Sequence, residues 1–232
     1  MAKANNLSGL YVVVDGIIGC GKSEQRKQLE KYLPLDFSEA TFQFTYEPGG
    51  NPEADELRKK LKFQTMSSEE EMLLFAKSRS ITLPKVVAPA LSEGKIVISD
   101  RSVTTSLAYQ AFGRELGIER VWEANKRAVN GILPDVVVYM NVGREACFKR
   151  SGGEDPDKFD AEDEKFWDRT ILGYDKMLEF IKKISPETRC IQINDPDGTL
   201  SIEETRLAIR NELYPILRNH LHEGRIHRDR QV

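Results

Sequence analysis

The feature that most constrains this chain is the run Gly16-Ile-Ile-Gly-Cys-Gly-Lys-Ser23, which fits the pattern G-x-x-x-x-G-K-[ST]. It directly follows an apolar run, Leu10–Val14, and opens a helical pattern over Gly21–Tyr32, which is the context that confirms a phosphate-binding loop. Its glycines let successive backbone N–H groups face a triphosphate, and the helix N-terminus adds positive partial charge. Lys22 is expected to reach the β- and γ-phosphates of a bound nucleoside triphosphate, and Ser23 to ligate Mg²⁺. The expected contacts to the triphosphate are Gly16, Ile17, Ile18, Gly19, Cys20, Gly21, Lys22 and Ser23.

Short β-branched runs alternate with longer helical patterns along the rest of the chain. The runs expected as further strands are Thr41–Thr45, Ile96–Ser99, Val136–Val142 and Cys190–Ile193. Continuous apolar strands favour burial on both faces, as in a parallel sheet, and each gap between them is long enough for a crossover helix. The pattern predicts an α/β fold of the P-loop type, with roughly five parallel strands and helices on both faces.

Helix boundaries can be placed at several points. Ser67 and Glu70 form a capping-box pattern that opens a helix towards Leu91. Pro84 and Pro89 are expected to kink that helix or cut it short, and Pro34 to stop the first helix. A last helix is expected from near Ser201.

Two polar segments differ from their neighbours. Residues 151–164 have little to bury and follow a strand and a short helix, near the end of the sheet where ligands bind, so we expect a mobile lid. Residues 223–232 are charged and are expected to form a flexible tail. The whole chain, 1–232, is expected to be one domain.

Composition excludes several classes of protein. With 34 Lys+Arg against 37 Asp+Glu the net charge is −3, which argues against a dedicated nucleic-acid binder. The longest apolar runs fall far short of the ~20 residues of a membrane span, and no signal peptide is recognisable. Three cysteines without metal-ligand spacing favour a reducing compartment, and we expect the cytoplasm.

A second acidic anchor follows another expected strand. Asp100 ends the run Ile96-Val-Ile-Ser-Asp100, where a Walker-B acid would hold Mg²⁺; it could also be the N-cap of the next helix. The nearest candidate for a guanine-reading motif, Asn125-Lys-Arg-Ala128, lacks the acid, which argues against a GTPase. A lid that excludes water favours a small kinase.

Several motifs over most of the chain resemble the thymidylate kinase family. They are Thr45-Tyr-Glu-Pro-Gly-Gly-Asn51, Leu74-Phe-Ala-Lys-Ser-Arg79, Asp100-Arg-Ser-Val-Thr-Thr-Ser-Leu-Ala-Tyr-Gln110, Leu133-Pro-Asp135 and Phe166-Trp-Asp-Arg169 with Tyr174. The resemblance implies transfer of a phosphoryl group from ATP to dTMP with Mg²⁺, and a homodimer formed through helices.

The resemblance also implies roles for individual residues. Arg101 would contact the acceptor phosphate, Phe75 would stack on thymine, Arg79 would donate to thymine O4, and Tyr109 would pack under the sugar. Arg150 would lie by the ATP base or phosphates. Further acceptor-site residues are expected at Asp15, Glu47, Pro48, Arg58, Ser106 and Gln110.

The chain departs from the family pattern at a few positions. Ile18 stands where an acid is frequent, Tyr46 where an arginine is frequent, and Ser102 where an aromatic residue is usual. The phosphate loop has no arginine, so the catalytic cation is expected from the lid, where Lys158 replaces an arginine. The expected catalytic residues are Lys22, Arg101, Lys158 and Arg150.

Two other functions compete with dTMP phosphorylation. Asp15-Gly-Ile-Ile-Gly19 and Asp100-Arg-Ser102 resemble the E-G-N-I-G and E-R-S motifs of deoxynucleoside kinases, in which an acid serves as base for a sugar hydroxyl. The departures at Ile18, Tyr46 and Lys158 would also suit an inactive nucleotide-binding relative. Thymidine and dTMP offered in parallel separate the first two functions, and ATP binding without turnover would identify the third.

Overall fold

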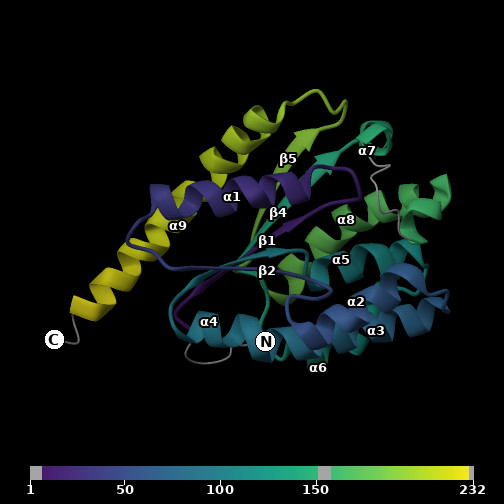
Figure 1. Ribbon diagram of the computed structural model, residues 1–232, viewed down its shortest axis with the longest axis horizontal. Coiled ribbons are helices and arrows are strands. Elements are labelled where there is room, and N and C mark those ends of the chain that lie inside the picture. The colour runs from purple at the N-terminus through teal and green to yellow at the C-terminus, as the bar shows by residue number, and fades with distance from the viewer. Residues whose placement is uncertain (1–6, 151–157, 230–232) are drawn as a thin grey trace.

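The strands of this protein form one parallel sheet in the order β2-β3-β1-β4-β5 (Figure 1). The computed structural model describes residues 7–150 and 158–229. Within them the strands are β1 (Leu10–Asp15), β2 (Phe42–Tyr46), β3 (Ile96–Asp100), β4 (Val136–Val142) and β5 (Arg189–Asp195). The central β1 pairs with β3 and β4, and its residues are all buried, as the continuous apolar strands predicted. The predicted α/β fold is confirmed.

Helices cover both faces of the sheet, with α1 and α9 on one face and α3, α5, α6 and α8 on the other (Figure 1). The α-helices are α1 (Lys22–Asp36), α2 (Pro52–Phe63), α3 (Ser68–Thr82), α4 (Ala88–Ser92), α5 (Val103–Ala108), α6 (Ile118–Val129), α7 (Arg144–Arg150), α8 (Glu164–Ile184) and α9 (Ile202–Asp229). Three shorter elements are the π-helices η1 (Leu83–Val87) and η2 (Tyr109–Gly113) and the 3₁₀-helix η3 (Lys158–Ala161).

The predicted capping box and proline kink are both found in the α3 region. The Ser67 side chain accepts a hydrogen bond from the Glu70 backbone N–H, and the Glu70 carboxylate accepts one from the Ser67 N–H. Pro84 has no N–H, so the i→i−4 ladder cannot continue there and the chain widens into η1 before α4 begins.

Two predicted helix ends were wrong. Pro34 does not stop α1, which continues to Asp36; the proline lies in the last turn, and the Phe37 N–H closes the helix on the Leu33 carbonyl at 2.9 Å. The last helix does not end before the predicted tail: α9 continues through Glu223 up to Asp229 and extends away from the sheet (Figure 1). The last residues of the predicted tail, 230–232, and residues 151–157 of the predicted lid lie outside the described residues.

The helices of the described residues include none that combines the length and the apolar character needed to cross a membrane.

Candidate active site

The phosphate loop connects β1 to α1, as the motif predicted. Gly19 and Gly21 have φ values of 73° and 94°, in the left-handed region that favours glycine. A Cβ atom on Gly19 would stand 2.1 Å from the Cys147 carbonyl oxygen, so the loop fits against α7 only without a side chain there. The glycines therefore allow both the turn and the close packing of the loop.

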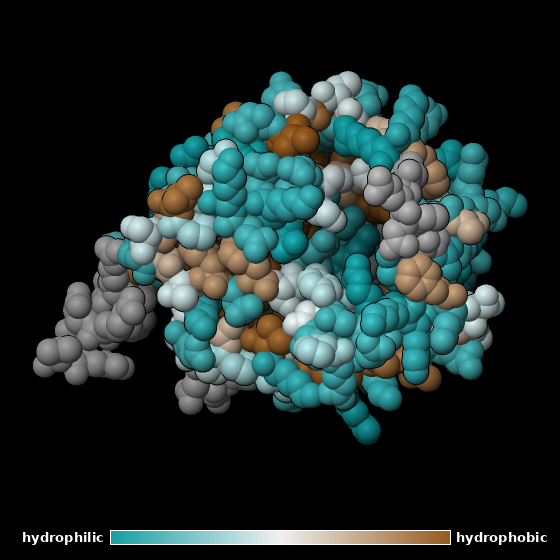
Figure 2. Space-filling view, viewed as in Figure 1, coloured by the Kyte–Doolittle hydropathy of each residue, from teal (hydrophilic) through white to brown (hydrophobic). Residues whose placement is uncertain are grey.

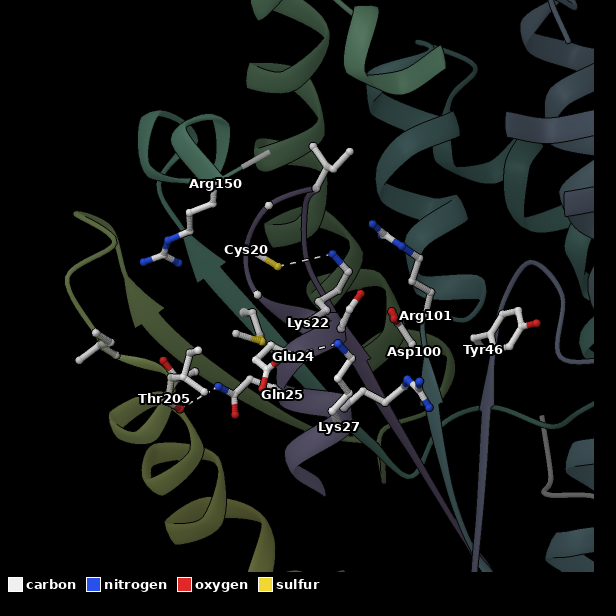
Figure 3. A pocket seen from close by; sticks show the side chains of 18 of the residues that line it. Cys20, Lys22, Glu24, Gln25, Lys27, Tyr46, Asp100, Arg101, Arg150 and Thr205 are labelled. Atoms are coloured by element: carbon white, nitrogen blue, oxygen red, sulfur yellow. Dashed lines mark hydrogen bonds and ion pairs between the residues drawn. The ribbon is translucent and has the colours of Figure 1, made fainter. Parts of the chain in front are cut away.

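A cavity of about 940 Å³ lies over this loop. Figure 2 shows the surface hollowed on this side of the molecule, with mostly hydrophilic residues around the hollow. In Figure 3, Asp100, Arg101 and Tyr46 lie on one side of Lys22, and Arg150 and Thr205 on the other. The cavity is lined by loop residues Ile18 to Ser23 and, from other elements, by Tyr46, Glu47, Arg58, Asp100, Arg101, Met140, Arg150 and residues 200–202 and 205.

The Lys22 ammonium lies within the loop that carries it. Nζ donates to the Ile17 carbonyl at 2.7 Å and lies 3.5 Å from the Cys20 sulfur, and only 6% of the residue is exposed. A compact cation is thus held at the floor of the cavity, beside the N-terminus of α1.

Asp100 ends β3 next to the end of β1, where Val14 is its partner in the register. Its Oδ1 atom is buried and has no hydrogen-bond partner, and Ser23 lines the same cavity. Oxygen donors of this kind suit a hard divalent cation. The alternative role as an N-cap is wrong, because Ser102 caps α5 by accepting from the Thr104 N–H.

Arg101 follows Asp100 with a φ of 73°, which is uncommon for a residue with a side chain. Its Nη1 atom lies 3.0 Å from the Gly16 carbonyl and 3.4 Å from Asp15, and its Nη2 lies 3.4 Å from the Tyr109 hydroxyl. The guanidinium also stands 5.1 Å from the centre of the Tyr109 ring. The strained backbone therefore directs this cation across the end of the loop.

A second, smaller pocket of about 90 Å³ adjoins the cavity. Its walls combine aromatic and aliphatic side chains with three cations, and they include four residues predicted for the acceptor site besides Arg101. The lining residues are Ile18, Pro48, Arg58, Leu61, Lys62, Phe75, Arg101, Thr105, Tyr109 and Phe159. Ile18, Arg58 and Arg101 line both spaces, so two guanidinium groups stand where the cavity and the pocket meet.

Arg58 is fixed by the loop that contains Glu47 and Pro48. Its Nη1 donates to the Pro48 carbonyl at 2.9 Å, and its guanidinium lies 5.2 Å from the centre of the Tyr46 ring. The Tyr46 hydroxyl donates to Asp55 on α2 at 2.9 Å. Tyr46 therefore supports the guanidinium of Arg58, which comes from α2.

The sequence did not identify four residues of the small pocket, Leu61, Lys62, Thr105 and Phe159. The Phe159 ring lies 6.4 Å from that of Phe75 and 5.8 Å from that of Tyr109. A lone aromatic residue within an acidic segment was a signal for it. Thr105 carried no signal in the sequence, because its place depends on how α5 packs.

Arg79 lies in a buried cluster and not in the wall of either space. Its Nε is 2.7 Å from Glu47 Oε2, each side chain being 2% exposed, and its Nη2 donates to Ser106 at 3.3 Å. Its Nη1 donates to Asn125 on α6. Burial raises the pKa of the Glu47 carboxyl, and the adjacent Arg79 opposes that shift.

Other predicted residues also lie apart from the cavity walls, among them Gly16, Ile17 and Ser106. Asp15 is fully buried beneath the loop. Gln110 is buried and donates to Glu71 at 3.1 Å. Lys158 forms an ion pair with Glu71, at 2.8 Å, rather than with a residue of the phosphate loop. Arg114 joins the same cluster through Glu71 and through Glu162, which follows η3. The described part of the predicted lid is therefore attached to α3 through Glu71 and to Arg114, the residue that follows η2.

Arg150 lies at the opposite end of the cavity, as Figure 3 shows. Its Nη2 donates to the Gly198 carbonyl at 2.6 Å and lies 3.7 Å from Asp195 at the end of β5. The segment 200–205 beside it was a further part of the cavity that the sequence did not identify. These residues follow the last strand, so the rule that ligands bind at the carboxyl ends of strands could have pointed to them.

Comparisons with known proteins agree on one family. A family model described as thymidylate kinase matches residues 14–192. The thymidylate kinase of Dehalococcoides mccartyi strain BAV1 is 38% identical over 168 residues, 71% of this chain and 80% of that protein. That of Thermoanaerobacter sp. strain X514 is 38% identical over 180 residues, 76% and 88% of the two chains. A crystal structure of thymidylate kinase from Ehrlichia chaffeensis has a TM-score of 0.69 at 26% identity, covering 89% of this chain and 98% of that one.

Proposed function

The chain belongs to the thymidylate kinase family, and from that premise we propose that it transfers the γ-phosphoryl group of ATP to dTMP, giving ADP and dTDP. ATP would occupy the cavity of about 940 Å³ over the phosphate loop, and dTMP the adjoining pocket. The competing functions of the sequence, a deoxynucleoside kinase and an inactive relative, are not favoured by these comparisons.

One observation supports this function most directly: Ile18, Arg58 and Arg101 line both spaces. Two arginines at the junction suit an acceptor phosphate facing a donor phosphate, because phosphoryl transfer needs in-line positioning and neutralised charge. A phosphate acceptor is already largely ionised, so no strong general base is required. Lys22 would stabilise the charge that grows on the transferring group.

The small pocket supports a nucleoside as the acceptor. Phe75 and Tyr109 present aromatic faces for the base and the sugar, and Arg58 lies at the phosphate end. Arg79 has five N–H groups, of which Glu47, Asn125 and Ser106 engage three. We propose that the remaining N–H groups of Arg79 donate to thymine O4, with Ser106 and Gln110 near the base edge.

Mg²⁺ is proposed as the metal that accompanies ATP, with Ser23 and Asp100 as the residues that would hold it. The unpartnered, buried Oδ1 of Asp100 fits that role. The metal would neutralise charge on the phosphate oxygens. Magnesium commonly takes one or two carboxylates and completes its shell with phosphate and water. A magnesium site of this kind needs no larger cluster of protein ligands. The described residues contain no group of three or more His, Cys, Asp or Glu side chains that could hold a metal ion.

Two further parts of the proposed function concern closure of the lid and the formation of a homodimer. We propose that residues 151–164 of this one-domain chain close over ATP, bringing Lys158 towards the γ-phosphate while Arg150 contacts the nucleotide. The ion pair of Lys158 with Glu71 would have to break in that closure. A homodimer formed through helices is proposed from the family resemblance, and sedimentation analysis tests it.

The decisive experiment is a coupled assay of ADP release with each deoxynucleoside monophosphate, and with thymidine in parallel. We expect turnover with dTMP and none with thymidine. Turnover with thymidine alone would identify a deoxynucleoside kinase. ATP binding without any ADP release would identify an inactive relative.

A further inference from the structure

The carboxylate of Asp15 is the centre of a buried hydrogen-bond cluster beneath the phosphate loop. Asp15 ends β1 and is fully buried. Its oxygens accept hydrogen bonds from the Gly16 N–H at 2.8 Å, from Thr104 at 2.6 Å and from Thr105 at 2.7 Å. The Tyr174 hydroxyl donates to it at 2.6 Å. Asp15 lines neither of the two ligand spaces, so we consider a role for its carboxylate other than direct substrate binding.

Two of these donors contact Arg101 as well as Asp15. The Thr105 hydroxyl accepts from Arg101 Nη1 at 3.3 Å, and the Tyr174 hydroxyl accepts from the same atom at 3.4 Å. Each hydroxyl therefore donates to the carboxylate and accepts from the guanidinium. Thr104 differs, since it donates to Asp15 but is not among the residues to which Arg101 donates a hydrogen bond.

Tyr174 connects three elements of the site. It comes from α8, the helix that follows the lid, and its ring stacks on that of Tyr139 in β4 with centres 4.7 Å apart. Its hydroxyl also lies 2.9 Å from the Gly16 carbonyl, which accepts from Arg101 as well. Burial raises the pKa of the Tyr174 hydroxyl well above its usual range, and Asp15 adds to that shift, so the hydroxyl keeps its proton and donates.

We propose that Tyr174 and Thr105 are positioning residues that hold the Arg101 guanidinium at the junction of the two ligand spaces. Their hydroxyls bridge the buried Asp15 carboxylate and Arg101 Nη1 and so fix the place of that nitrogen. The other nitrogen, Nη2, then lies towards Tyr109 and the small pocket. This inference rests on the proposed function, because Arg101 acts there on the acceptor phosphate. It assigns Asp15 to the support of that arginine.

A double-mutant cycle with Arg101 tests the inference. Tyr174→Phe keeps the stacked ring and removes only the hydroxyl, and Thr104→Val removes a hydrogen bond of equal length to Asp15. We expect Tyr174→Phe to lower kcat by about 30-fold, because small displacements of a catalytic group are costly, and Thr104→Val to lower it by less than about threefold. In an Arg101→Ala background, Tyr174→Phe should change kcat by less than about twofold, since its effect passes through Arg101.

Two results would overturn the inference. One is an equal loss of kcat in Tyr174→Phe and Thr104→Val; the other is a loss in Tyr174→Phe that persists undiminished when Arg101 is absent. Should Tyr174→Phe fail to fold, Thr105→Val removes the second hydroxyl and enters the same cycle with the same expected outcome. Wild-type enzyme without dTMP kinase activity would refute the proposed function instead, so the two failures are distinguishable.

Discussion

The phosphate end and the base end of this site are built in different ways. At the phosphate end, the glycine-containing loop, one lysine and the start of α1 line an open cavity of about 940 Å³. At the base end, Arg79 on α3 is buried between Glu47 beyond β2 and Asn125 on α6, next to a pocket of about 90 Å³.

The two ends differ in the partners of their cations, Lys22 at the phosphate end and Arg79 at the base end. Among the described residues, the hydrogen bonds of Lys22 are local, to Ile17 and Cys20, and Lys22 lines the space where ATP would bind. Arg79 already has a buried carboxylate partner, 2.7 Å away. A change at the phosphate end should therefore affect catalysis with little effect on stability, whereas a change at the base end should affect both.

The sharpest test of the phosphate end is Lys22→Ala. Because Lys22 would stabilise charge that grows in the transition state, we expect kcat to fall by about 10²–10³-fold or more. Lys27→Ala is a matched control, since Lys27 lines the same cavity but is 68% exposed and pairs only loosely with Glu24. Near-wild-type turnover by folded Lys22→Ala would contradict the catalytic assignment.

At the base end, Arg79→Ala should act on both stability and base selection. Removing one partner of a buried ion pair leaves Glu47 uncompensated, and we expect a loss of about 3–5 kcal/mol in the free energy of unfolding. Cytosine presents an amino group where thymine presents O4, so the ratio of kcat/KM for dTMP over dCMP should also shrink. The measurements are urea unfolding and kcat/KM for dTMP, dUMP and dCMP.

The double variant Arg79→Met/Glu47→Gln separates the two effects. It removes both charges together and should recover much of the lost stability, because a neutral pair needs no compensation. We expect its dTMP/dCMP ratio to remain low. A ratio equal to that of the wild type would show that Arg79 does not select the base, and Ser106 and Gln110 would then become the candidates.

The phosphate end of the site was easier to predict from the sequence than the base end. The place of the phosphate loop between β1 and α1 could be predicted, because strand, glycines, lysine and helix start follow one another directly in the chain. The partners of Arg79 could not be predicted, since Asn125 lies 46 residues away and reaches Arg79 only once α3 and α6 pack together. Strand positions were predictable from apolar runs. The end of α1 was not, because it depends on the hydrogen bond from the Phe37 N–H to the Leu33 carbonyl, which lets the helix continue past Pro34.

Lys158 was predicted as a catalytic cation of the phosphate end, but it pairs with Glu71 beside the base end. If closure carries it to the γ-phosphate, Lys158→Ala should lower kcat by about tenfold with little change in the KM for dTMP, because a lid charge acts mainly in the transition state. Lys158→Arg should keep activity. An unchanged kcat in Lys158→Ala would transfer the role to Arg150, Lys149 or Arg169.

The smallest expected effect concerns Glu71, which joins the base end to the described part of the lid. Burial alone would raise the pKa of Glu71, but hydrogen bonds and charge from Arg114 and Lys158 outweigh burial and lower the pKa below its ordinary value. The stability that Glu71 contributes is therefore complete above the ordinary pKa of about 4.3 and is lost as the pH falls through the lower pKa of the folded state.

We expect Glu71→Gln to lower the free energy of unfolding at pH 7 by about 1–3 kcal/mol, because two cations lose a buried partner. The difference from wild type should shrink as the pH falls below about 4, since protonated Glu71 then resembles the glutamine. Glu69→Gln is the matched control: Glu69 lies on the same helix and pairs with Arg120, but both are more than half exposed, so its removal should have little effect. Thermal unfolding of the three proteins between pH 3 and pH 7 measures the comparison. A constant difference between Glu71→Gln and wild type across that range would mean that the Glu71 side chain acts there through its shape and not through its charge.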